Sequence, residues 1–143
     1  MYSIKENGLV SIEARKNADN EALTGTGVDM AGYGAVTFIA LAEGGEDASF
    51  SIKAQQAAAS DFSDAADLVG TATAFATVAS PSTDAKAVLE IRNPQERYVR
   101  SVTTVPNVSS AKVVSVIAIR TDPRNLPVSN AGELHVGPAE GTA

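Results

Sequence analysis

Apolar and polar residues alternate along several stretches of this chain, and such alternation is typical of β-strands that bury one face. In residues 49–54 and 85–92 every second residue is apolar. Further runs rich in apolar and β-branched residues cover 9–15, 33–41 and 71–78. Gly, Pro, Asn and Asp residues of the kind that form turns separate the runs. The pattern predicts an all-β fold, an antiparallel β-sandwich or barrel of about seven to eight strands.

The most informative run lies at residues 113–120 and follows a shorter one at residues 97–100. We expect two strands here, joined by a short turn. The second strand is apolar on both faces, with Val113, Ile117 and Ile119 on one and Val114, Val116 and Ala118 on the other. Because both faces need cover, this strand is expected at the centre of a sandwich or in a subunit interface.

Arginines and a tyrosine accompany these two strands, at Arg97, Tyr98, Arg100, Arg120 and Arg124. Guanidinium groups bind carboxylates of a neighbouring chain through paired hydrogen bonds, and Tyr and Arg are favoured anchors in protein interfaces. We therefore take these residues as candidate contacts to a partner or a sister subunit. The alternative for Tyr98 and Arg100 is an edge tyrosine with an arginine stacked beside it.

Two segments depart from the strand pattern. Residues 60–68 begin with Ser60 and Asp61, which can cap a helix, and they contain several alanines, so they predict one short helix. Residues 129–143 show no periodicity and predict a flexible or arm-like C-terminal tail. The preceding residues, 1–128, are expected to form a single sandwich domain with an N-terminal arm.

Composition narrows the classes of function. The chain has 143 residues and no cysteine, which excludes disulfides, thiolate zinc sites and cysteine nucleophiles. Aromatic residues are few, so the core must be built from Val, Ile, Leu and Ala, and oligomerisation would supplement its stability. A net charge of −6 without a lysine-rich run disfavours nucleic acid. No apolar run approaches the roughly 18 residues of a membrane-spanning helix, so no membrane partner is expected.

Charge is uneven along the chain. Residues 1–85 carry 4 basic and 12 acidic residues, whereas residues 86–124 carry 7 basic and 3 acidic residues. An acidic N-terminal half and a basic C-terminal half would permit contacts between copies or docking on an acidic host, and the alternative is scatter over a solvated surface.

Few residues suggest catalysis or metal binding. Asp61, Asp64 and Asp67 recur at every third position, but they lack the closer spacing and glycine turn of a calcium loop, so capping and a solvated surface are preferred. His135, the single histidine, falls in the Gly-rich tail, which is poorly suited to hold a catalytic imidazole. We therefore expect no enzyme activity, no catalytic residue, no metal and no cofactor.

The order of several motifs from about residue 28 to residue 128 resembles the small decoration, or cement, proteins of tailed bacteriophages, which are encoded near the major capsid protein. The motifs are Tyr33-Gly34-Ala35-Val36-Thr37-Phe38-Ile39-Ala40, Ile52-Lys53-Ala54-Gln55-Gln56, the segment from Asp61 to Leu68, Arg97-Tyr98-Val99-Arg100, and the exit from Ala118 to Val128.

This resemblance implies an all-β protein that binds the outer surface of an expanded capsid and stiffens it. The implied partners are the major capsid protein and sister copies in a homotrimer, and the implied location is the virion exterior, after synthesis in the host cytoplasm. The family brings no catalytic residues. The alternative function is a carbohydrate- or host-binding β-sandwich adhesion module, although the scarcity of aromatic rings for sugar stacking argues against it. A virion-associated hydrolase is a third possibility, and it lacks a recognisable nucleophile motif.

Overall fold

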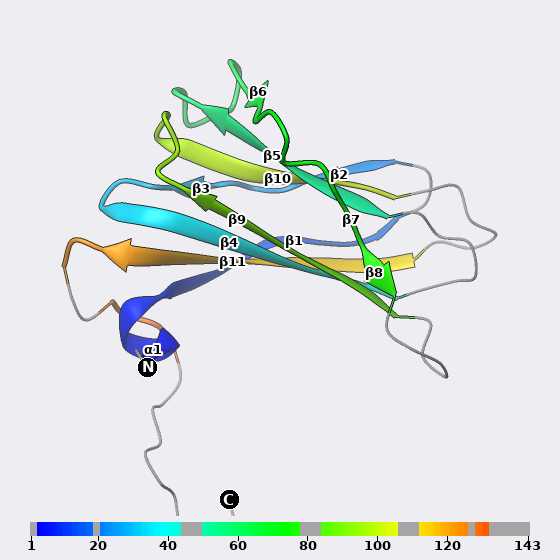
Figure 1. Ribbon diagram of the computed structural model, residues 1–143, viewed down its shortest axis with the longest axis horizontal. Helices are drawn as coiled ribbons and strands as arrows, with labels where there is room; N and C mark the ends of the chain where they lie inside the picture. Colours follow the sequence, from blue (N-terminus) through cyan, green and yellow to red (C-terminus); the bar gives the residue numbers. More distant parts are fainter. Residues whose placement is uncertain are drawn as a thin grey trace, which may run out of the picture.

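The computed structural model describes residues 3–18, 21–43, 50–77, 84–105, 112–125 and 128–131, and these form two antiparallel β-sheets that face each other (Figure 1). Their elements are α1 (Ile4–Asn7), β1 (Leu9–Ala18), β2 (Ala22–Thr24), β3 (Val28–Asp29), β4 (Tyr33–Ala42), β5 (Ser51–Ala57), β6 (Ala66–Asp67), β7 (Thr73–Ala74), β8 (Ala76–Thr77), β9 (Ala85–Arg92), β10 (Tyr98–Thr104) and β11 (Lys112–Pro123). The all-β sandwich predicted from the sequence is confirmed. No helix in these ranges is long and apolar enough to cross a membrane.

The first sheet has five strands in the order β1-β11-β4-β9-β8. Strand β11 pairs along its length with β1 on one side and with β4 on the other, so its predicted position inside a sheet is confirmed. Strand β9 pairs with β4, and the two-residue β8 covers only its first two residues, Ala85 and Lys86.

The second sheet has six strands, with β10 and β5 at its centre. Two short strands, β2 and β3, pair in succession with the outer edge of β10, and β6 and β7 pair in the same way with β5. Long strands therefore carry the middle of the sheet, and short segments close its edges.

The core lies between the sheets and follows the period of two that the sequence shows. In β9, burial alternates strictly from Ala85 to Arg92, with Ala85, Ala87, Leu89 and Ile91 turned inward. Buried residues also occupy every second position from Val36 to Ala42 in β4 and from Val114 to Ala118 in β11. Among the most deeply buried side chains are Val36, Phe38, Phe50, Ile52, Val99, Val114 and Val116.

The predicted hairpin between residues 97–100 and 113–120 is wrong. Strand β10 belongs to the six-stranded sheet, whereas β11 belongs to the five-stranded one. Local spacing predicts where the chain turns, but it does not distinguish a hairpin from a connection that crosses between sheets. The choice depends on which faces bury each other, and here each strand finds its partners elsewhere in the chain.

The predicted helix over residues 60–68 is also wrong. The segment is a series of turns followed by β6, and the short helix of this structure is α1, at Ile4–Asn7. Asp64 accepts hydrogen bonds from the backbone N–H groups of Ala58 and Ala59, and Asp61 accepts one from the N–H of Ser63. Such local bonds offer the backbone an alternative to a helix.

The β-rich run at residues 71–78 divides between the two sheets. Strand β7 pairs with β5 in the second sheet, and β8 then pairs with β9 in the first. This segment therefore carries the chain from one sheet to the other along one side of the sandwich, which Figure 1 shows at the right of the view.

The two ends of the described chain lie together beside α1. The Asn130 side chain donates hydrogen bonds to the carbonyl oxygens of Lys5 (3.1 Å) and Gly8 (2.6 Å), and it accepts one from the N–H of Val10 (2.9 Å). The Val128 N–H donates to the carbonyl oxygen of Glu6 (2.8 Å). The start of the predicted tail is thus held against the N-terminal segment, and its residues 132–143, which include His135, lie outside the described residues.

Candidate protein-binding surfaces

Three of the predicted contact residues lie together at one end of the six-stranded sheet. Arg97 binds Asp29 of β3 through two parallel hydrogen bonds, of 2.9 Å from Nε and 2.7 Å from a terminal nitrogen. The Arg97 guanidinium lies 5.3 Å from the centroid of the Tyr98 ring. Arg100, two residues further along β10, donates from Nε to Gln55 of β5 (2.8 Å). Arginine and aromatic groups are thereby fixed in one surface.

Phe62 joins this surface from the loop after β5. Its φ of 58° turns the chain so that the ring lies over Gly27, where an added Cβ would approach the ring to 2.2 Å. The Arg100 guanidinium lies 4.7 Å from the Phe62 centroid, and the Tyr98 ring meets Phe62 edge-on at 6.3 Å. We call Arg97, Tyr98, Arg100 and Phe62 the arginine–aromatic surface.

The other two predicted residues lie near Arg97 but are not part of the arginine–aromatic surface. Arg120 is half-buried between the sheets, donates to the backbone carbonyl of Asp29 (2.8 Å) and lies 5.0 Å from the Tyr33 ring centroid. Its role is to tie β11 to β3 rather than to face solvent. Arg124 is exposed, and it lines a hollow together with Arg97 and the loops at residues 30–33 and 93–96.

Electrostatics around the arginine–aromatic surface are those of satisfied ion pairs. The hydrogen bonds from Arg97 hold the pKa of Asp29 below its usual range, and the same pairing raises the pKa of Arg97. Both side chains are substantially exposed, so this pair contributes little to stability. The ion pair between Arg97 and Asp29 instead fixes the orientation of the Arg97 guanidinium, so that one face of this group lies against the Tyr98 ring.

The five-stranded sheet has an apolar outer face, of which the sequence predicted only the part on β11. The outward residues of the five-stranded sheet include Ile12 (74% exposed), Val88 (59%), Leu41 (53%), Val10 (42%) and Val113 (39%), with half-buried Ile39, Ile117 and Ile119 among them. The run at 113–120 predicted an apolar second face. The matching residues of β1, β4 and β9 could not be assigned to it before the strand order was known.

The register places four of these residues in one row across the sheet. Ile12 of β1 pairs with Ile117 of β11, which pairs with Ile39 of β4, which pairs with Val88 of β9. We call this the apolar row. Contiguous exposed apolar surface of this kind marks sites of protein association, whereas isolated apolar residues do not.

The three candidate aspartates diverge in the structure. Asp61 bonds to Ser63, Asp64 caps the backbone at Ala58 and Ala59, and Asp67 accepts hydrogen bonds from Lys53 and Gln55. The bonds from Lys53 and Gln55 lower the pKa of Asp67. Within the described ranges, no three His, Cys, Asp or Glu side chains are grouped as metal ligands would be.

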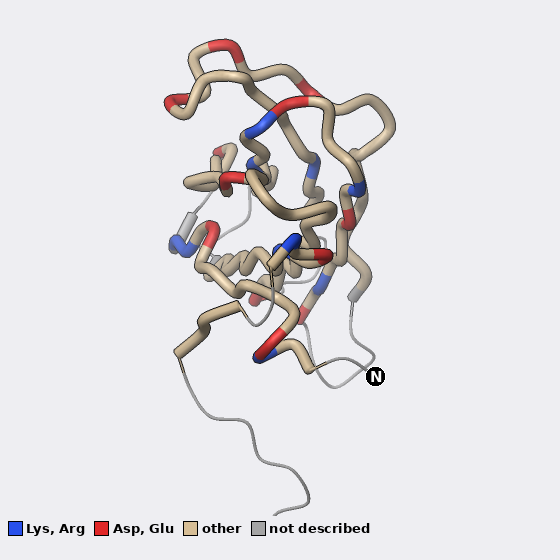
Figure 2. Tube along the Cα trace, turned by 90° about the vertical axis from the view of Figure 1, so that its left-hand side faces the viewer, with Lys and Arg blue, Asp and Glu red and all other residues tan. Residues whose placement is uncertain are grey.

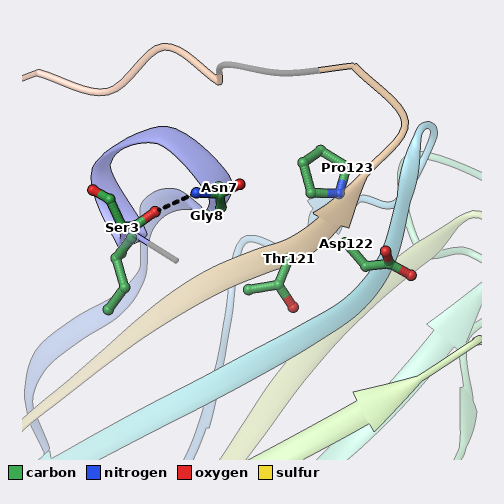
Figure 3. Close-up of a pocket in the computed structure, with 7 residues that line it drawn as sticks. Ser3, Asn7, Gly8, Thr121, Asp122 and Pro123 are labelled. Atoms are coloured by element: carbon green, nitrogen blue, oxygen red, sulfur yellow. Dashed lines mark hydrogen bonds between the residues drawn. The ribbon is translucent and has the colours of Figure 1, made fainter. Parts of the chain in front are cut away.

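A second hollow lies beside α1. It is lined by Ser3, Asn7 and the end of β11, and Asn7 donates from its side chain to the carbonyl oxygen of Ser3 (3.0 Å; Figure 3). The Asp122 carboxylate points away from Ser3 (Figure 3), and it lies where a Cβ on Gly34 would be. Among the described residues that line this hollow, Asp122 is the one carboxylate, and it is not directed at the Ser3 hydroxyl.

Charge is not divided between two halves of the molecule. The acidic and basic parts of the sequence interleave, because β1 and β4 lie on either side of β11. Figure 2 accordingly shows acidic and basic residues close together along the described chain. The predicted contact between an acidic half and a basic half therefore has no counterpart in these residues.

No protein-family model, curated protein or solved structure matches this chain.

Proposed function

We propose that this protein is a non-enzymatic decoration protein that binds the outer surface of an assembled bacteriophage capsid and stabilises it. The observation that supports a contact function is the arginine–aromatic surface, in which Arg97, Tyr98 and Arg100 lie together on one side of the six-stranded sheet around Phe62, which is 9% exposed. Arg and Tyr dominate the energetically important residues of protein interfaces. Rigid placement by Asp29 and Gln55 also reduces the entropy lost on binding.

Stabilisation of the capsid follows from selective binding. A protein that binds the assembled shell and not its free subunits shifts the assembly equilibrium toward the shell by mass action. Contacts that bridge adjacent capsid subunits multiply this effect, since the second contact forms at high effective concentration. The partner in this proposal is the major capsid protein, and the location is the virion exterior.

The test is co-sedimentation with expanded, undecorated shells of the major capsid protein encoded beside this chain. We expect saturation at a fixed number of copies per capsomer. Arg100→Glu reverses the charge beside Phe62 and should weaken shell binding by about tenfold or more. Arg15→Glu makes the same charge change on the five-stranded sheet and should leave shell binding close to that of the wild type.

Two results would contradict the proposal. One is the absence of shell binding at any ratio, and binding to a glycan array in that case would favour the adhesion module. The other is unchanged shell binding by a folded Arg100→Glu protein, which would remove the arginine–aromatic surface from the contact. Circular dichroism spectra of both variants establish that the fold is retained.

A further inference from the structure

The outer face of the five-stranded sheet is apolar, and no described part of the chain covers its centre. The apolar row crosses four adjacent strands, and Val10 and Ile119 extend it along β1 and β11. The inner faces of the two sheets already form the core, so the outer face is surplus to the fold of one chain. An apolar sheet face becomes stable when a second sheet packs on it at about 10 Å.

The size of this face suits a dimer of moderate affinity. Four strands about 4.8 Å apart, with about nine residues each at about 3.3 Å per residue, span about 600 Å². Two such faces in contact would bury about 1,200 Å², which is at the lower end of specific protein interfaces. Dissociation in the micromolar range is therefore expected.

The charges along β9 alternate in sign, and Arg92 binds Glu90 of the same strand (2.7 Å). The outward positions follow the order Asp84, Lys86, Val88, Glu90 and Arg92, with Asp84 directly before the strand. When the strand is read in the opposite direction, each negative charge stands where a positive one stood, and each positive charge stands where a negative one stood. An antiparallel copy centred on Val88 therefore meets opposite charges on both sides.

We propose that two copies of this chain associate through this face, about a two-fold axis that runs along the apolar row. The axis places each Val88 near its counterpart and each Lys86 opposite Glu90 of the other copy. Ile12, Ile117 and Ile39 then pack against the same row of the second copy. A two-fold contact of this type is self-complementary, as isologous interfaces must be.

The charges of β9 favour this axis over the other in-plane two-fold, and on β1 the same axis sets Arg15 opposite Val10 of the second copy at the edge of the contact. An axis parallel to the strands exchanges the positions of β1 and β9. It would bring Arg15 opposite Lys86, which is repulsive, and Val10 opposite Glu90, which leaves both Lys86 and Glu90 without an opposite charge on the second copy. The homotrimer implied by the family resemblance needs a different contact, because a three-fold axis joins two unlike surfaces.

The first test is sedimentation velocity of the purified chain from about 1 to about 300 µM, a range that brackets a micromolar dimer. We expect a monomer–dimer equilibrium. Val88→Lys places two ammonium groups together at the axis and should raise the dissociation constant by about tenfold or more. Val69→Lys is the matched control, because Val69 is fully exposed in the loop after β6, and it should dimerise as the wild type does.

The second test exchanges charges. The dimer of the Lys86→Glu protein and the dimer of the Glu90→Lys protein should each dissociate more readily than the wild-type dimer. Each substitution sets like charges opposite one another in both halves of the contact. An equimolar mixture of the two variants should form a heterodimer with restored affinity, because both facing pairs are then attractive. A merely structural effect of either substitution would not be rescued by mixing.

A wild-type monomer at every concentration would overturn the proposal, as would a trimer, or equal dimerisation by Val88→Lys and the wild type. These measurements need no capsid, so their failure is distinct from failure of the proposed function. A dimer that does not bind shells would contradict only the decoration role, and a monomer that binds shells would contradict only the dimer.

Discussion

Glu13 is a buried carboxylate on which the contact between the two sheets depends, and its removal should be strongly destabilising. It lies at an irregularity in β1, where the register shifts between Ile12 and Ala14, and only 1% of it is exposed. From there it reaches the second sheet. One carboxylate oxygen accepts from the Ser101 N–H (2.8 Å) and the other from the Gly27 N–H (3.0 Å).

The magnitude follows from these partners. Glu13→Ala leaves two N–H donors without an acceptor, at a cost of about 1 to 3 kcal/mol each when they are buried. Removing a buried charge offsets part of this cost, because the carboxylate is desolvated in the folded state. We therefore expect the free energy of unfolding to fall by about 3 kcal/mol. Glu13→Gln keeps the shape but turns one acceptor into a donor, and about 1 to 2 kcal/mol is expected.

Dependence on pH provides an independent readout. Burial raises the pKa of Glu13 above its ordinary value of 4.5, although the hydrogen bonds from Ser101 and Gly27 oppose the shift. Between 4.5 and the raised pKa the folded state binds more protons than the unfolded state. The contribution of Glu13 to stability therefore decreases as the pH rises through this interval. Glu13→Gln should remove this part of the dependence.

The assay is urea unfolding followed by far-ultraviolet circular dichroism at several pH values. Glu43→Ala is the control, because Glu43 is exposed, and its unfolding free energy should stay within about 0.5 kcal/mol of the wild type. The reasoning about Glu13 is refuted if Glu13→Ala unfolds at the same urea concentration as the wild type, or if its stability keeps the wild-type pH dependence.

Two further substitutions test other parts of the structure. Gly27→Ala places a Cβ 2.2 Å from the Phe62 ring, at a residue whose φ is 83°, so it should displace that ring. We expect thermal unfolding to show a loss of stability of about 1 to 3 kcal/mol, and we expect weaker shell binding. Unchanged stability and unchanged shell binding would mean that the ring does not rest on Gly27. Asn130→Ala removes the side-chain bonds to Lys5, Gly8 and Val10, and it should speed proteolytic cleavage near residue 130 several-fold with little change in the thermal midpoint. Equal cleavage rates would show that these bonds do not hold the segment.

Much of the strand content could be predicted from the chain itself, because a strand with one buried face requires alternation over only a few residues. The runs near residues 9–15, 33–41, 49–54 and 85–92 all correspond to long strands. The short strands β2, β3 and β6 gave weaker patterns, since two or three residues contain too little alternation to recognise, whereas β7 and β8 lie within the single run predicted at residues 71–78. The helix over 60–68 was misplaced because Asp and Ser residues suit turns as well as helix caps.

The candidate site was less accessible to sequence reasoning. Tyr98 and Arg100 could be recognised as neighbours on one strand face, because they are two residues apart. Phe62 could not be added, because it reaches Arg100 only through a positive-φ turn and the close approach to Gly27. Arg120 was assigned to the same contact surface, and the sandwich instead places it between the sheets against Asp29 and Tyr33.

The sequence by itself determined that the chain forms β-strands, which residues of β5 and β9 turn inward, and that one late strand is apolar on both faces. These properties depend on residues that are adjacent or two apart. Tertiary structure alone decided that β10 and β11 lie in different sheets, that Glu13 reaches Ser101 across 88 positions, and that Ile12, Ile117, Ile39 and Val88 form one row. The physical reason is that pairing between distant strands is selected by the combined burial of whole faces, which no local pattern records.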